Sequence, residues 1–176
     1  MASLKRVLIP TDFSVNSLRI VLEFLENHTA EEQLEMELVL VYGLQLSDSI
    51  TSLLAFNKED CLADLQSEDF IKGCEIIRTR YKDKLTELYA DVLTSKNPRY
   101  LQNYIKGHRI QQVIILEGLS FSPTARHNFD VNLTLKGMEK QLAVPLLHLQ
   151  VPEEMGTQRD LMDGIFFRKK WRLSYE

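Results

Sequence analysis

The sequence has little of what several classes of protein need. Its two cysteines, Cys61 and Cys74, cannot form a disulfide framework and lack the paired spacing of a zinc or thioredoxin-type site. No run of about 18 apolar residues is present, and the first residues lack the apolar stretch of a secretory signal. We therefore expect reduced thiols, no metal, no membrane association and a cytoplasmic location.

An excess of basic residues is also missing. The chain carries 21 Lys and Arg against 25 Asp and Glu, a formal net charge of -4. Binding to DNA or RNA draws mainly on cations that neutralise phosphates, so we expect no nucleic acid partner. A length of 176 residues with 44% hydrophobic residues fits one globular domain. We predict a domain over residues 1–151 and a C-terminal extension over residues 152–176.

Apolar runs predict the strands. Each run is nearly continuous rather than alternating, as in parallel strands covered on both faces, and they occupy residues 5–11, 36–43, 112–118 and 144–151. Helical patterns lie between them, which predicts an α/β doubly wound parallel sheet. Residues 47–66 are a polar and apolar mixture, for which we expect a short helix or a lid over one end of the sheet.

The helices have recognisable ends. Asp12 or Ser14 can accept the free amides of a helix that runs to about His28, and Ser67 can cap a long amphipathic helix. Apolar residues at steps of three and four extend that long helix to about Val92: Phe70, Cys74, Ile77, Tyr81, Leu85, Leu88 and Val92. Asn97 and Pro98 begin another helix, Gly107 ends it in a left-handed turn, and a last helix covers about residues 133–142.

Four segments of this sequence resemble the universal stress protein (UspA-like) family. They are VLIPTDFS at residues 7–14, LVLVYG at 38–43, VIILEG at 113–118 and GMEKQLAVPLLHLQV at 137–151. The resemblance implies a five-stranded parallel sheet in the order 3-2-1-4-5 and homodimers paired through the edge of the last strand. Because the helical pattern continues through residues 85–97, we predict four to five strands, with the third strand degenerate or missing at the edge of the sheet.

The nucleotide-binding motif of that family is incomplete here. The family carries GxxGx9G followed by Ser or Thr, whose glycines let backbone amides approach phosphates. Counted forward from Gly118, the next positions are Phe121, Val131 and Asn132; counted back from Pro145, the last pair is Asn132 and Leu133. Side chains at these positions fill space and restrict positive φ angles in either register. We expect no cofactor and no ATP binding of the family type.

Asp12 follows the first strand, where open α/β sheets bind ligands. The resemblance implies a contact of Asp12 with an adenine nucleoside, in a pocket lined by Pro10, Thr11, Val41 and Gly118. The alternative is that Asp12 serves, with Ser14, only to cap the following helix.

The loop over residues 118–132 offers a second set of polar side chains. Arg126 and His127, with Ser122 and Thr124, could contact an anion, and the alternative is a solvent-exposed loop. Ser120 lies in GLSFS, which does not match the GxSxG motif of hydrolases. No nucleophile and base can be paired, so we expect no enzymatic activity.

These observations favour a non-catalytic, universal-stress-protein-like stress-response or regulatory protein. It would act through association, as a homodimer paired through residues 144–151 and with a protein partner that the sequence does not identify. The alternative is a small-ligand or adenine-nucleotide sensor that holds ATP or AMP between Asp12 and the loop 118–132. The extension ends in a basic and aromatic segment, for which we expect docking on the domain or on a dimer partner.

Overall fold

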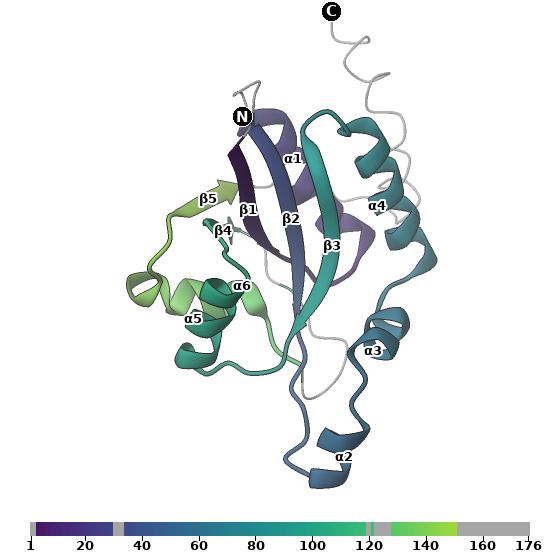
Figure 1. Ribbon diagram of the computed structural model, residues 1–176, viewed down its shortest axis with the longest axis vertical. Coiled ribbons are helices and arrows are strands. Elements are labelled where there is room, and N and C mark those ends of the chain that lie inside the picture. The colour runs from purple at the N-terminus through teal and green to yellow at the C-terminus, as the bar shows by residue number, and fades with distance from the viewer. Residues whose placement is uncertain (1–2, 30–33, 119–120, 122–127, 151–176) are drawn as a thin grey trace, which may run out of the picture.

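A computed structural model describes residues 3–29, 34–118, 121 and 128–150. Within these residues five parallel strands form one sheet in the order β3-β2-β1-β4-β5 (Figure 1). The strands are β1 Ser3–Pro10, β2 Leu34–Gly43, β3 Leu85–Leu93, β4 Gln112–Glu117 and β5 Leu146–Gln150. The predicted α/β class is confirmed, and the strand order is the one that the resemblance implied.

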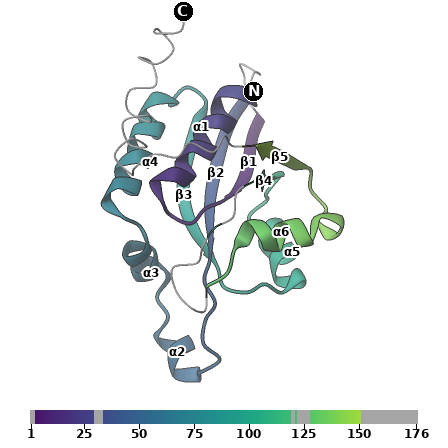
Figure 2. The same cartoon turned by 180° about the vertical axis from the view of Figure 1, so that it is seen from behind.

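Helices cover both faces of the sheet. A short 3-10 helix, η1 Val15–Ser17, leads into α1 Leu18–Asn27, and α1 packs with α4 Glu68–Arg80 on one face (Figure 2). The other face is covered by α5 Pro98–Gly107 and α6 Val131–Gly137, which precedes the 3-10 helix η2 Glu139–Gln141. The buried strands are apolar on both faces because each face has its own core.

The segment between β2 and α4 forms two short helices, α2 Ile50–Ala55 and α3 Lys58–Leu65. They extend beyond the carboxyl ends of the central strands, and α2 lies farthest from the sheet (Figure 1). None of the residues of α2 is buried. The predicted short helix over residues 47–66 is therefore present, as two helices rather than one.

The sheet has five strands, the upper number predicted, and the third strand is present rather than missing. The helix that begins at the Ser67 cap ends at Arg80, and β3 follows as the edge strand. Leu85 pairs with Met36 but Glu87 pairs with Glu37, so one extra residue interrupts the ladder on β3. This bulge brings Leu85 and Leu88, three residues apart, to the same core. The spacing of three was interpreted as helical, although a bulged strand produces it too.

The end of α5 also differs from the prediction. Asn97 caps the helix and Pro98 begins it, as expected, but Gly107 is its last helical residue. The left-handed conformation falls on Arg109, with φ of 53°. The last predicted helix begins earlier than expected, at Val131, and its second half is the separate 3-10 helix η2.

Candidate functional site

The carboxyl end of β1 is held by the side chain of Thr11. The Thr11 amide donates a hydrogen bond of 2.9 Å to the carbonyl of Val41, and its Oγ1 accepts the amide of Phe13 at 2.9 Å. The same Oγ1 lies 2.8 Å from Oγ of Ser17, and Thr11 is buried. These contacts hold Phe13 at a φ of 59°, a left-handed conformation that is unfavourable for a bulky residue. The turn after β1 is thus fixed by hydrogen bonds within the chain.

Asp12, the first predicted contact residue, is half-buried and bonds to its own turn. Its Oδ1 accepts the Ser14 amide at 2.9 Å and also the Ser14 hydroxyl. The Ser14 hydroxyl oxygen in turn accepts the amide of Ser17 and caps η1. Asp12 therefore makes the contacts expected from the alternative in which it serves, with Ser14, to cap the following helix.

The residues expected to line a pocket beside Asp12 belong to the sheet. Pro10 is buried, and Val41 is 0% exposed and packs in the core beneath α5 and α6. Pro10 and Val41 are register partners on β1 and β2. Gly118 has a φ of 76°, which suits glycine at the end of β4. Neither Pro10 nor Val41 presents a surface to a ligand in this conformation.

The carboxylate of Asp130 accepts hydrogen bonds from two backbone amides, one of them in the first turn of α6. Its Oδ1 accepts the amide of Leu133 at 3.1 Å, and its Oδ2 accepts the amide of Phe121 at 3.0 Å. The Phe121 side chain is buried in the core that α1 and α4 cover. Phe121, which the sequence register places at the second glycine of the family motif, therefore has a buried ring and an amide that already has an acceptor.

Asn132 completes the end of β4. Its Oδ1 accepts the amide of Leu116 at 2.7 Å, and its Nδ2 donates to the carbonyl of Leu116 at 3.0 Å. Asn132 is 4% exposed. The side-chain amide pairs with the backbone as a neighbouring strand would, so this position is structural.

A backbone bridge covers the carboxyl end of β2. Gly43 pairs with Phe129 in an isolated antiparallel bridge, in which the Phe129 amide donates to the Gly43 carbonyl at 3.1 Å. A Cβ atom at Gly43 would lie 2.3 Å from the Phe129 oxygen, so only glycine allows this approach. Asn128 adds a hydrogen bond of 2.7 Å to the Tyr42 hydroxyl. The described residues just before α6 thus cross the carboxyl end of β2.

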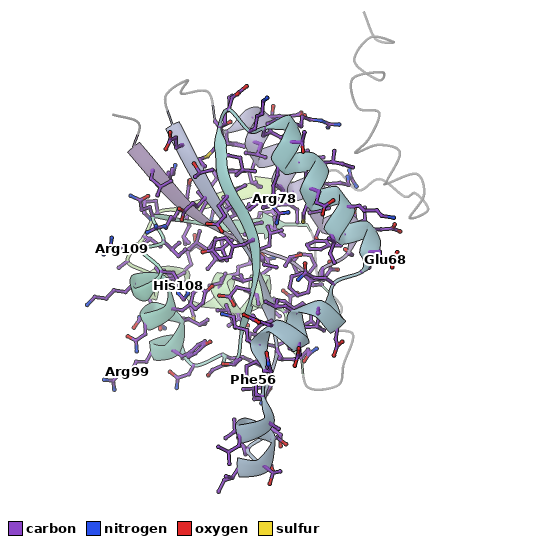
Figure 3. All side chains as sticks on the ribbon, turned by 45° about the vertical axis from the view of Figure 1, so that its right-hand side comes forward. Phe56, Glu68, Arg78, Arg99, His108 and Arg109 are labelled. Atoms are coloured by element: carbon purple, nitrogen blue, oxygen red, sulfur yellow. The ribbon has the colours of Figure 1, made fainter. Side chains whose placement is uncertain are left out.

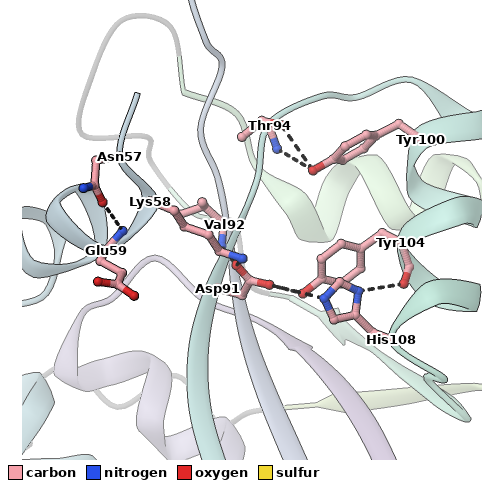
Figure 4. A network of polar contacts seen from close by, with 9 residues as sticks. All are labelled: Asn57, Lys58, Glu59, Asp91, Val92, Thr94, Tyr100, Tyr104 and His108. Carbon is pink, nitrogen blue, oxygen red and sulfur yellow. Dashed lines mark hydrogen bonds and ion pairs between the residues drawn. The ribbon is translucent and has the colours of Figure 1, made fainter. Parts of the chain in front are cut away.

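A second polar cluster, which the sequence did not indicate, surrounds Asp91 on β3 (Figure 4). One carboxylate oxygen of Asp91 lies 2.5 Å from Nζ of Lys58 and 2.8 Å from the Val92 amide nitrogen. The other accepts the Tyr104 hydroxyl at 2.6 Å and lies 3.9 Å from Nε2 of His108. The rings of Tyr104 and His108 stack at 4.0 Å. The signal was a single acidic residue within the apolar run LYADVL, but that run had been assigned to a helix.

The electrostatics of this cluster favour a structural role. Burial, and then the hydrogen bond to Asp91, raises the pKa of Tyr104 well above its ordinary value, so the phenol stays neutral and donates. Asp91 has a cation, a phenol and an amide around its two oxygens. These contacts join α3, β3 and α5.

Neither cysteine is activated as a thiolate by its surroundings. Burial raises the pKa of the Cys74 thiol to about 11, and burial with the nearby Asp64 raises that of Cys61. Among the described residues no three His, Cys, Asp or Glu side chains gather as a metal site, and no helix is long and apolar enough to cross a membrane. Several sequence-predicted positions lie outside the described residues: Ser122, Thr124, Arg126, His127 and the extension 152–176.

Removing the cation beside Asp91 tests this structural role. We expect Lys58→Met to lower the free energy of unfolding by about 2 kcal/mol, because a buried carboxylate loses its counter-charge but keeps its other hydrogen bonds. The double variant Lys58→Met with Asp91→Asn should recover part of that loss. Chemical denaturation measures both. Lys72→Met, an exposed lysine of α4, is the control and should change stability by less than about 0.5 kcal/mol. Equal effects at Lys58 and Lys72 would contradict the structural role.

Comparisons with known proteins gave structural matches of low sequence identity. No protein-family model and no curated protein matches the chain. Among solved structures, universal stress protein UspA from Lactobacillus plantarum is 16% identical, with a TM-score of 0.46 over 85% of this chain and 99% of that chain. A protein of the universal stress protein family from Burkholderia pseudomallei is 10% identical, with a TM-score of 0.46 over 82% and 95%. The hypothetical protein MJ0577 is 18% identical, with a TM-score of 0.49 over 85% and 98%.

At these identities and TM-scores, function has to be inferred from the contacts of this chain. The fold itself rests on the strand order β3-β2-β1-β4-β5, with helices on both faces. That is the five-stranded α/β fold that the resemblance to universal stress proteins implied.

Proposed function

We propose that this chain is a universal-stress-protein-like, non-catalytic stress-response or regulatory protein of the cytoplasm. It acts by associating with a second copy through β5 and with another protein, and it does not bind ATP in the family manner. The observation that carries this proposal is the position of Asp130. Its carboxylate already accepts the amides of Phe121 and Leu133.

Those contacts oppose a phosphate in two ways. The amides that would donate to phosphate oxygens already have an acceptor, and displacing it would leave a carboxylate next to a second anion. Phe121 is 8% exposed, so its ring would have to leave the core to open a cradle. Asp12, on the adenine side, bonds to Ser14. These contacts support association over the alternative of an adenine-nucleotide sensor.

The two edges of the sheet support pairing through β5. On the β3 edge, the Arg78 guanidinium binds the carbonyl of Leu88, with Nε at 2.9 Å and Nη2 at 2.5 Å. The Asp91 carboxylate binds the Val92 amide on the same strand. Side chains therefore cap two backbone groups that β2 does not bind. On β5, no side chain of the described residues bonds to the backbone of Leu146–Gln150, which favours this edge over β3 for pairing with another strand.

The absence of ATP binding can be tested on the full chain by thermal unfolding with ATP and magnesium, and with AMP. We expect no change in melting temperature at ligand concentrations up to about 5 mM, because a ligand stabilises the folded state only when its concentration exceeds its dissociation constant. The variant Asp12→Ala serves as the control. A rise in melting temperature that Asp12→Ala removes would favour the sensor instead.

Matched proline substitutions on the two edges test the pairing. Pro145 accepts the Val113 amide, so alternate residues, Leu146, His148 and Gln150, turn their backbone groups to the free edge. We expect a dimer by light scattering, and Gln150→Pro should weaken it by about tenfold or more, since proline removes an edge amide. Ala90→Pro places the same change on the β3 edge and should leave the dimer intact. A monomeric parent chain, or equal loss in both variants, would remove β5 as the interface.

A charged cluster beside β5 gives a dependence on pH. His148 Nδ1 lies 2.7 Å from Glu117 and its Nε2 lies 2.7 Å from Glu139, while Lys136 lies 2.6 Å from Glu117. Hydrogen bonds to Glu117, and then to Glu139, raise the pKa of His148. The protonated ring is therefore favoured by the folded state.

The sign of the effect follows from that raised pKa. The stability from His148 is fully present below about pH 6.5, the ordinary histidine value, and is lost as pH rises through the raised folded pKa. We expect the difference in melting temperature between the parent chain and His148→Gln to shrink between pH 6 and pH 9. His28→Gln, at the exposed end of α1, is the control and should show no such trend. A difference that grows with pH would contradict this assignment.

A further inference from the structure

A groove at the amino edge of the sheet is separate from the site around Asp12. It has a volume of about 900 Å³ and lies between the C-terminal end of α5 and the connection from η2 to β5. Leu4 and Arg6 of β1, Gln111 before β4 and Val144 before β5 border it. Small-molecule sites in proteins have volumes of about 300 to 1,000 Å³. The groove is therefore large enough for a small organic ligand.

The groove provides an apolar surface. Six of its lining residues are aliphatic, from β1, α5 and the chain before β5: Leu4, Ile105, Ile110, Leu142, Ala143 and Val144. Ile105 and Ile110 belong to the core beneath α5, and Leu142 and Val144 pack against it. The floor is thus anchored, and an apolar ligand body would bury against it with a gain of about 25 cal/mol per Å².

The charged residues of the groove all have one sign. Arg6, Lys106 and Arg109 line it, and neither Asp nor Glu does. Arg6 pairs with Glu37 at 2.5 Å. Lys106 and Arg109 make no ion pair with the residues that the structure describes. A chain of net charge -4 therefore places two uncompensated cations at an apolar groove.

Arg109 occupies a backbone position that favours glycine. The Ile110 amide donates to the Ile105 carbonyl at 2.9 Å, and the Arg109 amide donates to the Lys106 carbonyl at 3.2 Å. These two bonds form a Schellman motif, whose left-handed residue is usually glycine. Here it is arginine with φ of 53°, although a glycine stands two residues earlier. Unfavourable backbone conformations that persist often place a functional side chain.

We propose that this groove binds a small amphipathic organic anion. The apolar body of the ligand lies on the aliphatic floor, and its anionic group lies between Lys106 and Arg109. Four amide side chains, Gln102, Asn103, Gln111 and Gln141, also line the groove, and Gln102 Nε2 donates to the Gln141 carbonyl at 3.1 Å. This proposal does not depend on the proposed association through β5.

Three probes that share the same alkyl chain and differ in their head groups test whether binding depends on the charge of the ligand. Octanoate, octan-1-ol and octylamine would each be titrated into the full-length protein, with amide shifts followed by NMR. We expect saturable shifts with octanoate at the amides of Lys106, Arg109, Ile110 and Ala143. Octanol should bind at least about threefold more weakly, and octylammonium should not bind, because two cations repel it. Equal affinity for all three probes, or no shifts in this region, would overturn the proposal.

Variants at the two ends of α5 separate the effect of a charge on ligand binding from its effect on the stability of the fold. Figure 3 shows Arg109 at one end of α5 and Arg99 at the other. Arg109→Gly should leave the melting temperature equal or higher, because glycine suits the left-handed position. It should also weaken octanoate binding about 3- to 10-fold, as expected for one charge-assisted contact in a partly exposed site.

Lys106→Gln should give a similar loss, whereas Arg99→Gln, on the same helix and outside the groove, should give none. Ala143→Phe, which fills the groove, should abolish binding while the chain remains folded by circular dichroism. Binding that survives Arg109→Gly and Lys106→Gln unchanged would show that the cations do not hold the anion. Octanoate shifts confined to α2, whose Ile50 and Leu54 are 75% and 83% exposed, would show adhesion to that helix instead.

Discussion

Backbone amides at the carboxyl edge of a parallel sheet need acceptors, and here the chain supplies its own. The Phe13 amide bonds to the Thr11 hydroxyl and the Ser14 amide to Asp12. Asp130 accepts two amides before and within α6. Without these side chains, the amides would have to donate their hydrogen bonds to water or to a ligand. These four amides are therefore satisfied within the chain, and the conformation of the described turns follows from these side chains.

Much of the fold could be predicted from the sequence because local signals and the fold agree. The runs at residues 5–11 and 112–118 become β1 and β4, and the caps at Ser67 and Asn97 lie where expected. The third strand could not be recognised, since the bulge after Leu85 gives it a helical spacing. A bulge depends on the partner strand, which no local pattern reveals.

The strand ends near Asp12 and Gly118 were predictable, but the contacts of these residues were not. Asp12 and Gly118 do lie at strand ends, yet the role of Asp130 depends on its contact with the Phe121 amide, nine residues earlier in the chain. The cluster at Asp91 joins Lys58, Tyr104 and Asp91 from three elements. Such a meeting of distant residues is a property of the tertiary fold. The residue type predicts the left-handed turn at Gly107, whereas the hydrogen bonds at the end of the helix place it at Arg109.

The caps on β3 have a consequence for the size of any assembly. A sheet whose two edge strands are both unprotected can pair with further copies at each edge and form an open-ended assembly. In this chain Arg78 and Asp91 bind backbone groups on one margin, which opposes the addition of a further strand on the side of β3. Two such chains joined at β5 would present a capped β3 at each outer limit. Stacking by this route would therefore stop at a pair.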